Sequence, residues 1–189
     1  LLPHTKGILE STLQLAAQEA APPLARKLLA KLFQRIGLCY LPPRVATWRY
    51  QRGHRSLLEN LKADVPAVTR AAETPTTEED EHIEVPEELD SIIEQLLCGL
   101  RDSDTIVRWS AAKGIGRISA RLPKELADDI IGGVLELFVD VESDGAWHGG
   151  CLALAELCRR GVLLPSRLSE ACQVLLPALQ YDVLRGQHR

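Results

Sequence analysis

The sequence predicts an all-α protein built from stacked antiparallel helical hairpins. Composition, apolar spacing and a recurring helix-start signal carry this prediction. Aromatic residues make up only 4% of the 189-residue chain, which favours helices because strands draw on β-branched and aromatic side chains. No stretch approaches the roughly 20 apolar residues that cross a bilayer, and the first residues do not resemble a secretory signal. Met is absent even at position 1, so we expect a section of a longer chain.

Charge divides the chain into three parts. Residues 1–62 carry 10 basic and 3 acidic side chains, residues 63–94 carry 1 and 11, and residues 95–189 carry 11 and 12. Prolines, threonines and acids dominate 64–86, and such a stretch buries too little apolar surface to offset the entropy of ordering. The sequence therefore predicts a basic helical repeat section over 1–63, an acidic flexible loop over 64–86, and HEAT-like repeats over 87–189.

An apolar residue followed by proline recurs at Leu41-Pro42, Val85-Pro86, Leu122-Pro123 and Leu164-Pro165. Proline suits the first helical turn, where its missing N–H has no partner in any case. The starts near Pro86, Pro123 and Pro165 are 37 and 42 residues apart, which is the period of HEAT and armadillo repeats. We therefore predict a HEAT/armadillo-type α-solenoid with helices near 6–20, 23–37, 42–62, 87–100, 104–120, 123–139, 145–160 and 165–181.

Within the intervals, a second helix of each hairpin is expected to begin at an N-cap, at Asp102–Asp104 and at Ser143–Asp144. The bodies that follow, 107–118 and 146–157, are similar at an offset of 39 residues, and their small residues suit close helix packing. From this alignment we expect the structural core to include Trp109, Ile115, Ile118, Trp147, Leu154 and Leu157. Asp104 and Arg108 are spaced to pair within the helix, or an aspartate here could meet an arginine of the neighbouring repeat in a ladder.

No catalytic, cofactor-binding or metal-binding residue is expected. Gly114-Ile115-Gly116 begins like a dinucleotide fingerprint, but Ser119 stands where the third glycine belongs and no strand precedes it. His148 and Cys151 share a helix face, but two ligands are too few for zinc, and we expect both to pack against the next repeat. The five cysteines form no CxxC pair, so we expect buried, reduced thiols and a cytosolic compartment.

Two charged segments are candidate protein contacts. The acidic run Glu78, Glu79, Asp80 and Glu81 lacks the alternating oxygens and glycine of a calcium loop; a solvated linker and a contact with a basic partner both remain open. Arg49 and Arg52 lie among aromatic residues, as in a nucleic-acid reader. The acidity of the chain and of the adjacent segment opposes a polyanionic ligand, so a protein interface or internal ion pairing is preferred, with no nucleic acid as partner.

Three blocks resemble the tubulin-folding cofactor D family: residues 48–53, residues 104–117 and residues 146–157. The likeness extends over about residues 32–185, including the acidic loop. The resemblance implies a non-enzymatic, cytoplasmic and cytoskeleton-associated chaperone section that takes no cofactor. It further implies that the whole protein captures β-tubulin and works with cofactors C and E and a small Arf-like GTPase. In that complex the family contributes to GTPase activation of tubulin and to microtubule organisation. The alternative is a generic HEAT-repeat scaffold or transport adaptor that binds other proteins.

Overall fold

The computed structural model describes residues 2–18, 21–42, 85–139 and 142–185. Residues 1–42 and 85–189 belong to one compact unit, so the helices before the acidic stretch share their core with the helices after it. The helix predicted over 42–62 and nearly all of the predicted loop over 64–86 lie outside the described residues.

All regular structure in the described part of the chain is helical, and the all-α prediction is confirmed. The α-helices are α1 (Leu2–Ala16), α2 (Pro23–Tyr40), α5 (Glu88–Gly99), α6 (Thr105–Ser119), α7 (Lys124–Leu135), α8 (Asp144–Arg159) and α9 (Leu168–Arg185). Two short 3-10 turns, Glu136–Phe138 and Pro165–Arg167, follow α7 and precede α9.

The helix-start signals act where the sequence places them. Pro123 is the N-cap of α7, and Pro165 opens the turn that leads into α9. The Asp104 side chain accepts a hydrogen bond from the N–H of Ile106, and Ser143 caps α8 in the same way. Each cap satisfies an N–H that has no partner inside the helix, which explains why these boundaries are readable from local sequence.

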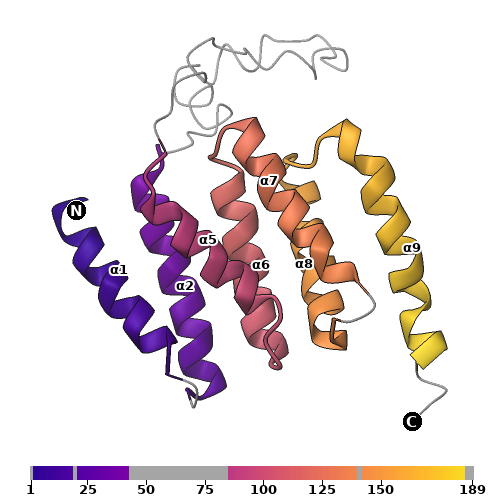
Figure 1. Cartoon of the computed structure of the whole chain (residues 1–189), viewed down its shortest axis with the longest axis horizontal. Helices are drawn as coiled ribbons and strands as arrows, with labels where there is room; N and C mark the ends of the chain where they lie inside the picture. The colour runs from indigo at the N-terminus through magenta and orange to yellow at the C-terminus, as the bar shows by residue number, and fades with distance from the viewer. Residues whose placement is uncertain (1, 19–20, 43–84, 140–141, 186–189) are drawn as a thin grey trace, which may run out of the picture. The chain divides into compact units, whose positions relative to one another are not determined.

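The helices stack in two layers. Figure 1 shows α2, α6 and α8 side by side, and these helices pack against one another in that order. Helix α5 packs on α2 and α6, and α7 packs on α6 and α8. Helix α1 packs on α2, and α9 packs on α8, at opposite ends of the row. Each hairpin therefore completes its core with side chains from its neighbours, as in other repeat proteins.

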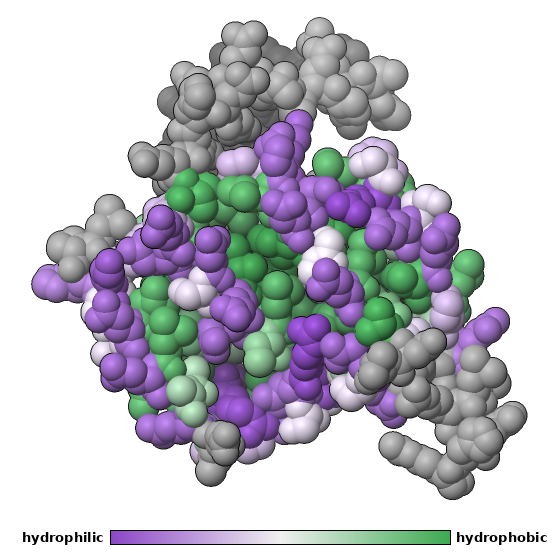
Figure 2. Space-filling model, viewed as in Figure 1, coloured by the Kyte–Doolittle hydropathy of each residue, from purple (hydrophilic) through white to green (hydrophobic). Residues whose placement is uncertain are grey.

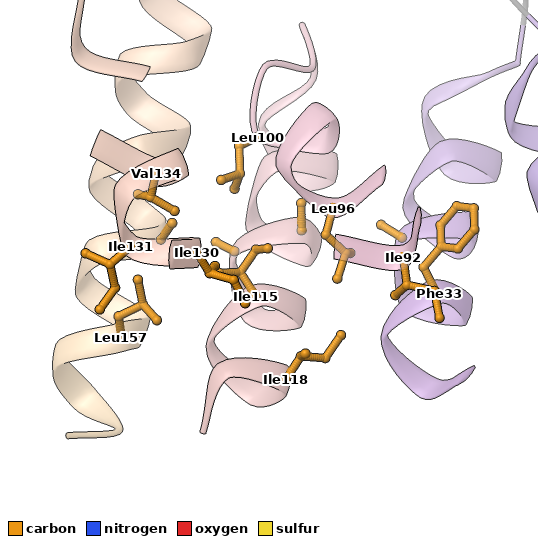
Figure 3. Close-up of a cluster of buried hydrophobic side chains, with 14 of the residues drawn as sticks. Phe33, Ile92, Leu96, Leu100, Ile115, Ile118, Ile130, Ile131, Val134 and Leu157 are labelled. Carbon is orange, nitrogen blue, oxygen red and sulfur yellow. The ribbon is translucent and has the colours of Figure 1, made fainter. Parts of the chain in front are cut away.

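One continuous hydrophobic core runs between the layers (Figure 3). Phe33 of α2 and Ile92 of α5 lie at one end of the cluster in the view, and Leu157 of α8 lies at the other, with Ile115 and Ile118 of α6 between them. Ile92, Ile115, Ile118 and Leu157 are fully buried. Helix α6 is therefore the central element of the described unit, because it contributes to the core on both sides.

Glycines permit the close approach of neighbouring helices, as the sequence predicts. A Cβ atom added at Gly149 of α8 would overlap the carbonyl oxygen of Leu100, and a Cβ at Gly114 of α6 would lie 2.9 Å from a methyl of Leu96. The added atom at Gly116 would lie 3.0 Å from the Cβ of Glu156. A larger side chain at these positions would force the helices apart.

Candidate protein-binding surface

The candidate contact residues Glu78, Glu79, Asp80 and Glu81, with Arg49 and Arg52, lie outside the described residues. Their proposed role in protein contact therefore stays a prediction. The described unit offers other groups that can reach a partner, and these lie on the exposed sides of α1, α2 and α6.

Trp109 does not lie in the core, and the expectation that placed it there is wrong. Its side chain is 45% exposed, and the ammonium of Lys113 lies 5.6 Å from the centre of the indole ring. The cause is helical phase: Val107, Ala111 and Ile115 occupy the buried face of α6. Trp109 lies with Ile106, which is also exposed, on the opposite face.

The other expected core residues of these two helices lie inward. Ile115, Ile118 and Leu157 are fully buried, and Leu154 is 2% exposed. Trp147 is half-buried. Its ring and that of Phe138 pack edge to face with their centroids 5.5 Å apart, and its Nε1–H donates to the carbonyl of Val139 at 3.1 Å. Because its polar end is satisfied by backbone, Trp147 closes the turn after α7 and leaves no donor for a ligand.

An ion pair links successive repeats at the N-terminal ends of α2 and α6. The Arg26 guanidinium donates two hydrogen bonds to the Asp102 carboxylate, at 2.8 and 3.0 Å. Asp102 also accepts a hydrogen bond from the backbone N–H of Asp104. The sequence anticipates an aspartate–arginine contact between repeats, but the residue that makes it is Asp102, because the Asp104 side chain is used as the helix cap.

Arg108 extends these polar contacts toward α8. We call the contacts that involve Arg26, Asp102, Arg108 and His148 the polar row. It is 8% exposed, and its guanidinium donates to the carbonyls of Asp102 and Ser103 and to the Thr105 hydroxyl. Its Nε–H donates to Nδ1 of His148 at 3.2 Å. The predicted pairing of Arg108 with Asp104 is replaced by these contacts, which hold the loop before α6 against the start of α8.

The row also shifts the ionisation of two side chains. Burial alone would raise the pKa of Asp102, but hydrogen bonds from Arg26 and from the Asp104 N–H hold that pKa below its ordinary value. Burial lowers the pKa of His148, and the positive charge of Arg108 lowers it further. The folded structure therefore favours the form of each group that is present at neutral pH: a carboxylate for Asp102 and a neutral imidazole for His148.

The cysteines are free, but they are not generally buried. Cys39, Cys98, Cys158 and Cys172 are exposed, and Cys151 is half-buried. The expectation of buried thiols is therefore wrong for four of them, because the helix positions that they occupy face away from the core. In the described part of the chain, no three His, Cys, Asp or Glu side chains lie close enough to hold a metal ion.

Exposed apolar side chains gather along α1 and α2. Leu15, Leu28 and Leu32 line a groove of about 430 Å³ between the two helices, and Leu28 and Leu15 are 55% and 51% exposed. Figure 2 also shows hydrophobic side chains in the middle of the viewed face, bordered by polar side chains. Apolar surface of this kind commonly marks contacts with other proteins. Among the described helices, none is long and apolar enough to span a membrane.

The helices form two layers around one shared core, and polar contacts join successive repeats. This architecture is that of an armadillo-type helical-repeat protein. A family model described as "Tubulin-specific chaperone D-like, ARM repeats" matches residues 24–189. The chain belongs to this tubulin-specific chaperone D-like family.

Relatives agree with this assignment. The chain is 42% identical over 178 residues to "Tubulin-specific chaperone D" of Dictyostelium discoideum, covering 87% of this chain and 12% of that protein. It is 30% identical over 176 residues to "Tubulin-folding cofactor D" of Schizosaccharomyces pombe, covering 85% of this chain and 14% of that protein. The chain thus spans only a small part of the length of these relatives. No solved structure matches it.

Proposed function

We propose that this chain is a non-catalytic solenoid section of a tubulin-folding cofactor. The observation that carries the proposal is the family match over residues 24–189, joined by relatives named as tubulin chaperones. The whole protein would capture β-tubulin and take part in assembly and disassembly of the tubulin heterodimer. Its further partners would be cofactors C and E and a small Arf-like GTPase, in a cytoplasmic complex that activates GTP hydrolysis by tubulin.

The described unit supports a binding role by its physical character. Helices α2, α6 and α8 share a continuous core and are joined by the Arg26–Asp102 and Arg108–His148 contacts. Stacked repeats of this kind form an extended surface, which can present side chains from several helices to a large client. The acidic run at Glu78–Glu81 and the basic residues Arg49 and Arg52 are proposed as additional contacts with partner proteins.

The proposal is tested by affinity purification of the full-length tagged protein from cytosol. Recovery of β-tubulin, in amounts that fall when unlabelled tubulin is added as competitor, is the expected result. Recovery of transport receptors or phosphatase subunits without tubulin would favour a generic HEAT-repeat scaffold and would refute the proposal. The acidic run is tested separately by deleting Thr76–Glu84 in the same protein. Unchanged β-tubulin binding at low salt would exclude a role for that run.

A further inference from the structure

Five basic side chains lie on the solvent side of two adjacent helices: Lys27, Lys31 and Arg35 of α2, and Lys113 and Arg117 of α6. We call this surface the basic face. Neither α2 nor α6 contains an acidic residue along its whole length. In contrast, α5 carries three acidic residues and no basic one. Helices α2 and α6 therefore differ in charge from α5, which packs on both of them.

The basic side chains of α2 and those of α6 face the same way, as contacts in the core show. Helix α5 covers one side of the pair, since Leu96 packs on Gly114 of α6 and Ile92 packs on Gly37 of α2. Lys31 and Arg35 are exposed on α2, and Lys113 and Arg117 are exposed on α6, on the sides turned away from α5. Lys27 is half-buried, one helical turn before Lys31.

The two helices run parallel and in step. Near their starts, Arg26 of α2 binds Asp102 just before α6. Near their ends, Arg121 after α6 donates to the carbonyl of Leu38 in α2. Residues four apart on a helix are separated by about 6 Å along its axis, and packed helices lie about 8–10 Å apart. The basic face therefore presents two rows of cations whose spacing along each row is about 6 Å.

The charges of the basic face are not neutralised within the described part of the chain. Arg26, Arg101, Arg159 and Arg167 each form an ion pair with a carboxylate there, whereas none of the five residues of the basic face does. Beyond Arg117, Arg160 of the neighbouring helix end pairs with Glu156 at 3.4 Å, so it is not part of the basic face. Burial lowers the pKa of Arg160 in the neighbouring helix end, and the charges of Arg159 and Arg117 lower it further, although Glu156 opposes them.

We infer that the basic face binds an extended acidic segment of a partner protein. In an extended chain, side chains on one side repeat about every 6.8 Å, which is close to the spacing of Lys27, Lys31 and Arg35 along α2. Glutamate or aspartate at alternate positions would meet one cation each. Trp109 and Ile106, exposed beside Lys113, would contact apolar side chains that lie beyond the acids on the same side of the segment.

A protein segment fits this surface better than a nucleic acid. Single-stranded nucleic acids bind basic grooves by stacking bases on aromatic rings, and among the described residues Trp109 is the exposed aromatic side chain beside the basic face. The ammonium of Lys113 already lies over its ring, so that face is closed to a base.

The test measures binding of two fluorescent probes to the full-length protein by anisotropy at low salt. One probe is a peptide in which glutamate alternates with serine, and the other is a thymidine oligonucleotide of equal charge. The variant of the basic face is Lys31→Glu/Lys113→Glu. The matched control, Lys6→Glu/Lys124→Glu, makes the same change in net charge on other helices, and Lys31→Arg/Lys113→Arg keeps the charge. Circular dichroism verifies that all variants are folded.

We expect the peptide to bind at least tenfold more weakly to the variant of the basic face, and within threefold of the parent affinity to both controls. Equal weakening by the two charge reversals would overturn the inference, since net charge alone would then explain binding. Absence of peptide binding to the parent would also overturn it, as would tighter binding of the oligonucleotide through the same lysines. The inference rests on the proposed protein-binding role, but its test contains no tubulin, so it can fail while tubulin capture stands.

Discussion

Substitution of Gly149 by alanine tests the packing of the solenoid most directly. The added methyl group would overlap the carbonyl oxygen of Leu100 and lie 2.8 Å from its carbonyl carbon and 3.1 Å from its Cα. All three are backbone atoms, so no side-chain rotation relieves the overlap. Helix α8 must move away from the end of α5, and the core contacts between them must loosen.

The expected magnitude follows from two opposing terms. Overpacking of a core typically costs about 1–3 kcal/mol, and a clash with backbone belongs at the upper end of that range. Alanine is favoured over glycine inside a helix by about 1 kcal/mol, which offsets part of the cost. We therefore expect Gly149→Ala to lower the free energy of unfolding by about 2 kcal/mol. In a chain of this length that corresponds to a decrease in Tm of about 4–8 °C.

Gly132 of α7 provides the matched control. It also lies inside a helix, but an added Cβ there would meet nothing within 4 Å. Gly132→Ala therefore keeps the helix-propensity gain without the clash, and we expect it to stabilise the chain by about 0.5–1 kcal/mol. The two substitutions are chemically identical, so their difference of about 3 kcal/mol isolates the contact with Leu100.

The assay is urea denaturation followed by far-ultraviolet circular dichroism, with all three proteins at the same low concentration. The transition slope should stay constant, so that midpoints report stability. If Gly149→Ala unfolded at the same urea concentration as the parent chain, or at a higher one, the close approach of α8 to Leu100 would be refuted.

Three further predictions concern the core and the polar row. Trp109→Ala should cost about 1 kcal/mol or less because the side chain is 45% exposed. Ile118→Ala, at a fully buried position of the same helix, should cost about 2–5 kcal/mol, and equal losses in urea denaturation would contradict the phase assigned to α6. Asp102→Asn should cost about 1–2 kcal/mol, because a charged hydrogen-bonded pair is lost at a partly exposed site. Since the pKa of Asp102 is lowered in the folded state, the parent loses this contribution as pH falls toward and below about 4, and the variant should show no such loss. The folded-state pKa of His148 is also lowered, so its contribution is complete above about pH 6.5 and declines on acidification; His148→Gln should flatten the stability profile between about pH 5 and 7, and an unchanged profile would exclude the histidine as its source.

Local sequence rules were sufficient for the helix starts that carry a proline or a cap, whereas the helix predicted over 6–20, which has neither signal, lies at Leu2–Ala16. Pro123 and the caps Asp104 and Ser143 act on backbone groups within three residues of themselves, so their effect does not depend on the rest of the fold. The start of α7 is therefore at Lys124, one residue from its predicted place. The all-α class follows from the same rules, because hydrophobic periodicity is a property of each helix alone.

Trp109 shows where side-chain size misleads. A large aromatic residue in an apolar helix suggests a core position, but the neighbouring repeat holds the better signal. At the offset of 39 residues, Trp109 aligns with His148, which is exposed, and Arg108 aligns with the half-buried Trp147. Because the aligned residue of the next repeat is the polar His148, the alignment would have placed Trp109 on the surface.

The basic face had a sequence signal that was overlooked. Residues 23–40 and 105–119 contain seven basic residues and no acidic one, but the whole interval 95–189 is nearly neutral, and this average concealed the pattern. Even so, the sequence does not show that α2 and α6 are neighbours. That adjacency joins helices separated by more than 60 residues, and it arises only when the hairpins stack.

The sequence by itself determined the helical class, the repeat period, the caps and the family, because each depends on residues close together in the chain or on a recognisable block. The tertiary structure decided which aspartate pairs with Arg26, which side of α6 is buried, and which cations form one surface. These outcomes depend on side chains that meet only when different repeats pack, and the physical reason is that burial and ion pairing are contacts in space. No local pattern specifies the partner across a helix interface.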